Sequence, residues 1–180
     1  MRSALIVTAL ASLALGMAPP ALASDDWTAL HRSLQLRMLN AGARCPVTDS
    51  RSVDHGRFSG AGSGPVYALL PSLFEADGRH AGWIGSKTLW IWPTRLLQHG
   101  IHVLVRGRRL DHAGVMRFQL GPNWDSPLRS ELHIDTSQPV GSFSGTTWGA
   151  TVTMLFGRTH GCYGLQLDAR HGTSTIVVAT

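Results

Sequence analysis

The sequence predicts an all-β domain, a two-sheet antiparallel sandwich of about seven or eight short strands with one short N-terminal helix. Two observations support this fold class. After residue 45, short segments rich in β-forming residues follow one another, and turn residues separate them. No helical periodicity interrupts the series. A small β-barrel is compatible with the same strand count and is the alternative.

The expected strands occupy, in chain order, residues 66–70, 83–92, 102–106, 115–120, 132–134, 148–156, 162–169 and 174–179. Pro93 stands where the second of them would stop, since a proline cannot donate to a sheet ladder. The glycine-serine stretch at 56–64 is expected to be a loop. The last two strands form a hairpin that begins at Cys162, which favours an immunoglobulin-like arrangement.

Residues 1–23 have the pattern of a cleaved signal peptide. Arg2 precedes the apolar stretch Ala4–Met17, and small residues mark a cleavage site between Ala23 and Ser24. A pair of prolines interrupts the apolar stretch before it reaches the roughly 20 residues that span a bilayer. We therefore expect an exported protein, periplasmic or secreted, with no membrane span after cleavage.

Between the signal peptide and the sandwich at 45–180, the segment 24–44 is expected to be helical or a linker. Apolar residues recur there at helical spacing, two acidic residues mark a helix start, and a glycine can end the helix. The apolar residues are Trp27, Leu30, Leu34 and Met38, the acidic residues are Asp25 and Asp26, and the glycine is Gly42. The pattern predicts one short amphipathic helix over residues 25–40, either packed on the domain by its apolar stripe or partly mobile.

The two cysteines, Cys45 and Cys162, are expected to form a disulfide, because an even cysteine count in an exported chain favours a bridge. Neither belongs to a C-x-x-C pair, so a redox or metal site is the weaker interpretation. In the chain-entropy model, closing so long a loop stabilises the fold by about 4–5 kcal/mol.

Charge and catalytic motifs exclude several function classes. The formal net charge of +5 comes from scattered basic residues, and no recognised nucleic-acid motif is present, so we expect no nucleic-acid partner. The segments 60–64 and 141–145 both misplace the serine of the G-x-S-x-G pattern that many hydrolases share. These features favour a non-enzymatic protein, and an exported hydrolase is one alternative.

Nine histidines raise the question of a metal site. The closest local arrangements pair His99 with His102 and His112 with Met116, a donor set that suits copper or zinc. On an extended segment, however, residues three apart point to opposite sheet faces. Ordinary surface histidines and no cofactor are therefore expected, with periplasmic metal binding as the other alternative.

Four residues are candidates for ligand binding. Trp90 and Trp92 share one sheet face at strand spacing, where they form a binding platform if exposed and core if buried, and burial is the more frequent outcome. Arg108 and Asp111 lie in an arginine-rich segment where the aspartate can accept an arginine fork. A partner, if these residues bind one, would be a protein or glycan at the cell envelope.

The chain also resembles a set of exported bacterial proteins of uncharacterised function, in patches over residues 45–180. The shared segments are Cys45-Pro46-Val47-Thr48, Gly85 with Leu89-Trp90 and Trp92-Pro93, Arg108-Arg109-Leu110-Asp111, and Gly161-Cys162-Tyr163. Tyr163 stands where that group has tryptophan, and residues 49–82 lack its proline-rich run. The resemblance implies export, the sandwich fold and the disulfide, and it implies no catalytic residues.

Overall fold

The computed structural model describes residues 27–70, 75–76, 80–96, 100–121, 125–139, 141–142 and 147–180. The predicted signal peptide with its cleavage site, Asp25, Asp26 and His99 lie outside these residues.

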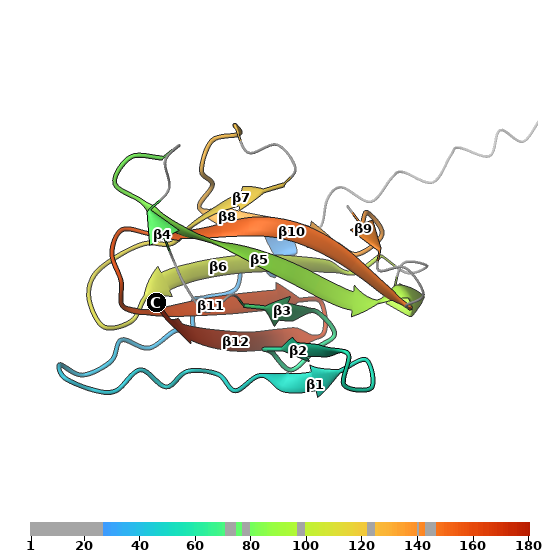
Figure 1. Cartoon of the computed structure of the whole chain (residues 1–180), viewed down its shortest axis with the longest axis horizontal. Coiled ribbons are helices and arrows are strands. Elements are labelled where there is room, and N and C mark those ends of the chain that lie inside the picture. Colours follow the sequence, from blue (N-terminus) through green and yellow to red (C-terminus); the bar gives the residue numbers. More distant parts are fainter. Residues whose placement is uncertain are drawn as a thin grey trace, which may run out of the picture.

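Two antiparallel sheets pack as a sandwich, as predicted, and the described strands do not close into a barrel. The first sheet has the order β3 (Tyr67–Leu69), β5 (Ile84–Pro93), β10 (Trp148–Gly157) and β7 (Arg117–Leu120), with β4 (Glu75–Ala76) beside β5 and β9 (Gly141–Ser142) beside β10. The second has the order β12 (Gly172–Ala179), β11 (Cys162–Ala169), β6 (His102–Arg109) and β8 (Glu131–Asp135). Figure 1 shows the long strands β5 and β10 running side by side.

Every predicted strand is present, because each is an apolar run whose alternate residues fill the space between the sheets. The inward residues of β11, for example, include Tyr163, Leu165 and Leu167, all nearly inaccessible to solvent. The prediction of a loop over residues 56–64 is wrong in part. Phe58–Gly60 forms β2, which pairs with β1 (Arg51–Val53) in a small separate hairpin, and only the rest of that stretch is loop.

The helix expected over residues 25–40 is also wrong within the described residues. Only a 3-10 turn, η1 (Thr28–Leu30), is helical there, and the chain is extended after it. Leu30 and Leu36 are buried, whereas Leu34 and Met38 are 42% and 45% exposed. The apolar stripe is therefore not used, because contacts with the second sheet override the local helical preference. A second 3-10 turn, η2 (Thr94–Leu96), follows β5.

We call residues 27–50 the N-terminal strap, since they lie across the outer face of the second sheet. Two main-chain hydrogen bonds hold the strap on the sheet. Leu39 N donates to Leu110 O at 2.8 Å, and Thr48 N donates to Val177 O at 2.9 Å. In Figure 1 the blue-to-cyan chain reaches β1 along the side of the molecule next to β12. Within the described residues, no helix is long and apolar enough to span a membrane.

Candidate functional site

The predicted disulfide is confirmed. Cys45 of the strap and Cys162 at the start of β11 are joined, with their Cα atoms 5.5 Å apart. The bridge links the strap to the outer face of one sheet, and it is half-enclosed by Leu36, Leu110 and Val177. The bond therefore holds the strap on the sandwich, and it does not join the two sheets.

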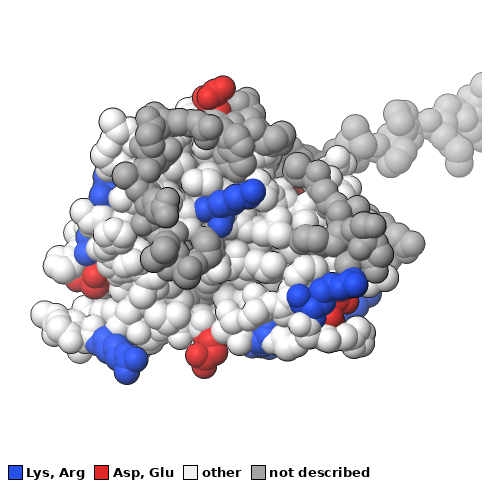
Figure 2. All heavy atoms as spheres, viewed as in Figure 1, with Lys and Arg blue, Asp and Glu red and all other residues white. Residues whose placement is uncertain are grey.

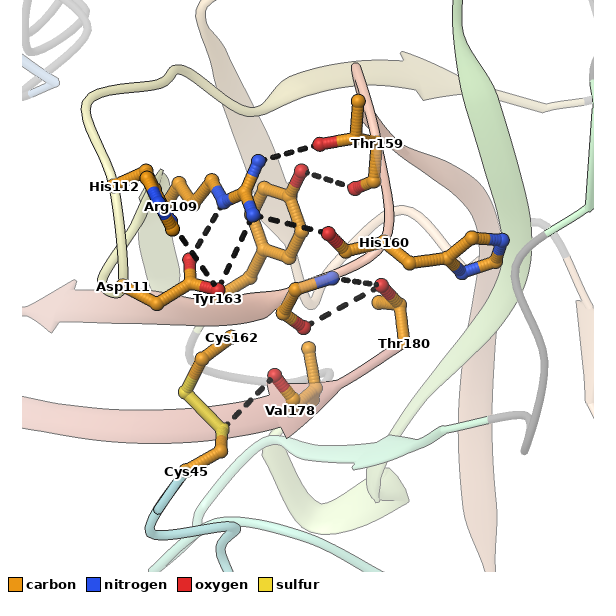
Figure 3. Close-up of polar contacts among 11 residues, drawn as sticks. Cys45, Arg109, Asp111, His112, Thr159, His160, Cys162, Tyr163, Val178 and Thr180 are labelled. Atoms are coloured by element: carbon orange, nitrogen blue, oxygen red, sulfur yellow. Dashed lines mark hydrogen bonds and ion pairs between the residues drawn. A yellow bond between two sulfur atoms is a disulfide. The ribbon is translucent and has the colours of Figure 1, made fainter. Parts of the chain in front are cut away.

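Beside the disulfide, Arg109 organises the corner where β10 leads into β11 (Figure 3). Its Nε and Nη2 atoms donate to the two oxygens of Asp111, at 2.6 and 3.2 Å. The guanidinium also donates to the Thr159 hydroxyl, and to the main-chain oxygen of His160 at 3.1 Å. All three nitrogens of the group are thus engaged within the protein.

The predicted arginine fork on Asp111 therefore exists, and Arg109 provides it. The hydrogen bonds from Arg109 hold the pKa of the Asp111 carboxyl well below its ordinary value, and the same contact raises the pKa of Arg109. Arg108 is half-buried, with its Nε enclosed and without a hydrogen-bond partner. The fork fixes the connection after β6, and a ligand would have to break it to reach either charge.

Tyr163 completes this corner. Its hydroxyl donates to the main-chain oxygen of Thr159 at 2.6 Å, and the Arg109 guanidinium carbon lies 6.0 Å from the centre of its ring. Figure 3 shows that the His160 side chain points away from these contacts. A Cβ at Gly157 would lie 2.5 Å from the Tyr163 hydroxyl, and one at Gly161 would lie 2.7 Å from Arg109 Nη2, so a side chain at either position would displace these groups.

Trp90 and Trp92 share a face, as predicted, but that face is the core. Both are 0% exposed. The indole Nε1 of Trp90 donates to the Thr153 hydroxyl at 2.9 Å, and that of Trp92 to the Thr136 main-chain oxygen at 3.1 Å. Burial with both N–H groups satisfied removes these tryptophans as a ligand platform.

Among the described residues, the metal-ligand candidates are not brought together. His102 begins β6 and His112 follows its far end, while Met116 is buried in the core. His102 stacks on Trp27 with ring centroids 4.4 Å apart. In the part of the chain that the structure describes, no group of three histidine, cysteine or acidic side chains could hold a metal ion.

A buried polar network under the strap was not anticipated. Asp168 is 0% exposed and accepts hydrogen bonds from Arg106 at 2.8 Å, Gln166 at 3.0 Å and Thr173 at 2.6 Å. The Gln166 carboxamide also bonds the strap, accepting from Gln35 N at 2.6 Å and donating to Ser33 O at 3.1 Å. The network holds the strap main chain through side chains. Its signal in the sequence is two polar residues at alternate positions of an otherwise apolar strand.

An apolar cavity of about 290 Å³ opens at the end of the sandwich where β11 turns into β12. Its floor consists of core residues, Val66, Val103 and Leu167, which are between 2% and 4% exposed. Ser63 and Ser174 supply polar groups in the lining. Sequence reasoning missed this site because its walls come from three separate segments.

On the face shown in Figure 2, the basic and acidic side chains that are coloured lie in small scattered groups, some with both signs side by side. In the comparisons with known proteins, no family model matches the chain, and no curated protein or solved structure matches it either.

Proposed function

We propose that this protein is an exported, non-enzymatic binding module that accepts a small apolar ligand in the cavity at the end of the sandwich. The carrying observation is the cavity itself, a concave opening whose lining includes buried core side chains. Ligand sites in proteins are concave, mostly apolar and provided with a few polar groups, and this cavity has that composition.

The cavity volume limits the size of the ligand. A dry apolar cavity of about 150 Å³ accepts benzene, and the present cavity has about 290 Å³. A single ring or a short alkyl chain therefore fits. Because Ser63 and Ser174 supply hydroxyl groups in the lining, an amphipathic molecule with one hydroxyl should bind more tightly than a pure hydrocarbon.

The experiment is an NMR titration of the oxidised protein with toluene and with hexanol. We expect both to shift the methyl signals of Val66, Val103 and Leu167. Ala169, half-buried in the wall of the cavity, is the position to block. Ala169→Phe should fill the space and abolish both responses, while Ala179→Phe, an exposed position at the end of the same hairpin, should leave them unchanged. Equal binding of toluene by Ala169→Phe and the wild type would contradict the proposal.

Export is the part of this proposal that rests on the sequence. A disulfide in the fold agrees with a non-reducing compartment. The mass of the protein recovered from the periplasm or medium should correspond to a chain that begins at Ser24. A full-length chain retained inside the cell would contradict export.

An immunoglobulin-like connectivity is likewise a proposal. The Tyr163 hydroxyl bonded to a carbonyl four residues upstream supports it, because such a tyrosine corner occurs in immunoglobulin-type sandwiches. The position of the disulfide differs from that in antibody domains. There the bond joins the two sheets, whereas here it joins the strap to one sheet.

A further inference from the structure

A second, polar hollow of about 500 Å³ lies where β7 and β8 begin, away from the apolar cavity. It is lined by Arg117, Leu128, Arg129, Ser130, Glu131 and His133. Two main-chain hydrogen bonds of 2.9 Å between Phe118 and Arg129 fix the two chain segments against each other here. The hollow therefore lies on paired backbone, although it includes residues just before β8.

The two arginines of this hollow differ from Arg106 and Arg109, whose side chains form ion pairs. Arg106 and Arg109 are bound to Asp168 and Asp111 respectively. Among the residues that the structure describes, neither Arg117 nor Arg129 has a side-chain hydrogen bond or an ion pair. Arg117 is also half-buried as a residue, so part of its side chain packs against the protein at this hollow.

The one carboxylate in the lining, Glu131, contacts two histidines, and within the described residues no ion pair joins it to either arginine. His133 Nε2 lies 2.9 Å from Glu131 Oε1, and His31 Nε2 lies 3.4 Å from Glu131 Oε2. The His133 ring is held in turn by Trp27, with ring centroids 4.2 Å apart and planes 12° from parallel. The hollow thus presents two guanidinium groups with a positioned imidazole beside them.

We propose that this hollow binds an organic oxyanion, a phosphate or carboxylate group attached to a small apolar body. Guanidinium groups recognise both oxyanions through paired, charge-assisted hydrogen bonds. Leu128 and the His133 ring supply the surface for the attached body, and the hollow is far larger than an inorganic ion requires. This site is independent of the apolar cavity, so either proposal can fail alone.

The test is an NMR titration with phenyl phosphate and benzoate, with phenol as the neutral probe and inorganic phosphate as the probe without an apolar body. We expect phenyl phosphate to shift the amides of Ser130 and His133 and, through His133, the indole signal of Trp27. The Trp83 indole, which contacts Arg158 elsewhere, should not move. Benzoate should bind the same residues more weakly, since it carries less charge, and phenol should not bind.

Substitutions then locate the charge requirement. Arg117→Gln and Arg129→Gln should each weaken phenyl phosphate binding about tenfold, because each removes a charge-assisted contact. Arg95→Gln removes an exposed arginine of η2, which is not in the lining of the hollow, and it should change phenyl phosphate binding less than twofold. Equal weakening by Arg95→Gln, or phenol binding as tightly as phenyl phosphate, would overturn the proposal. The proposal would also be overturned if millimolar phenyl phosphate caused no shifts at Ser130 and His133 of the folded wild-type protein.

Discussion

At the scale of single residues, the corner around Arg109 shows how this chain uses its charges. The Asp111 carboxylate receives two hydrogen bonds from one guanidinium, and its side chain is 28% exposed. Asp111→Asn should lower the free energy of unfolding by about 1 kcal/mol at neutral pH, the upper end for partly exposed ion pairs. Urea unfolding of both proteins measures this difference.

The pH dependence of that difference has a definite sign. Because the folded protein lowers the pKa of Asp111, its contribution is complete above the ordinary carboxyl pKa of about 3.9 in the unfolded chain. It is lost as the pH falls through the lower value in the folded state. The difference in unfolding free energy between the wild type and Asp111→Asn should therefore be constant between about pH 5 and 8, and it should shrink in stronger acid. Asp49→Asn, an exposed site without a partner among the described residues, should show no such convergence.

At the scale of elements, side chains hold part of the strap, in addition to its main-chain hydrogen bonds and the disulfide. The Gln166 carboxamide bonds the strap at Ser33 and Gln35 and also bonds Asp168. Gln166→Ala should cost about 1–3 kcal/mol, since it leaves the buried Asp168 with one donor fewer. Its specific signature is faster amide hydrogen exchange at Gln35, measured by NMR.

A matched control separates this effect from general destabilisation. Gln138→Ala removes the same side chain from an exposed turn after β8, and it should leave exchange at Gln35 unchanged. If Gln166→Ala lowered stability but left that amide as protected as before, the strap would be held by its main-chain bonds and the disulfide.

The elements also show how far the sequence alone could predict this molecule. Its long strands were predictable because apolar runs bounded by turns carry their burial pattern locally, as in β11. The extended strap was not predictable, because the spacing of Trp27 and Leu30 fits a helix. Only contacts with a distant part of the chain favour the extended conformation. Burial of Trp90 and Trp92 was a recognised outcome that the sequence could not settle. Neither hollow was predictable, since each is lined by segments that only the folded chain brings together.

At the scale of the whole molecule, the disulfide joins the segment before the sandwich to its last hairpin, over a sequence separation of 117. Removing the bond frees a long loop in the unfolded chain, which the chain-entropy model values at about 4–5 kcal/mol. Domains of this kind have a total stability of about 5–15 kcal/mol. The bridge is therefore a large share of what keeps this fold intact.

The double variant Cys45→Ala with Cys162→Ala should lose about that amount in chemical unfolding at neutral pH. Dithiothreitol should destabilise the wild type to a similar extent and leave the variant unchanged, which separates the bond from other effects of the reductant. Because the bond holds the strap, amides of the strap should lose exchange protection before those of β5 and β10, the paired long strands of the opposite sheet. A loss below about 1 kcal/mol, with strap protection retained, would mean that Gln166, Arg106 and the main-chain bonds hold the strap without the bridge.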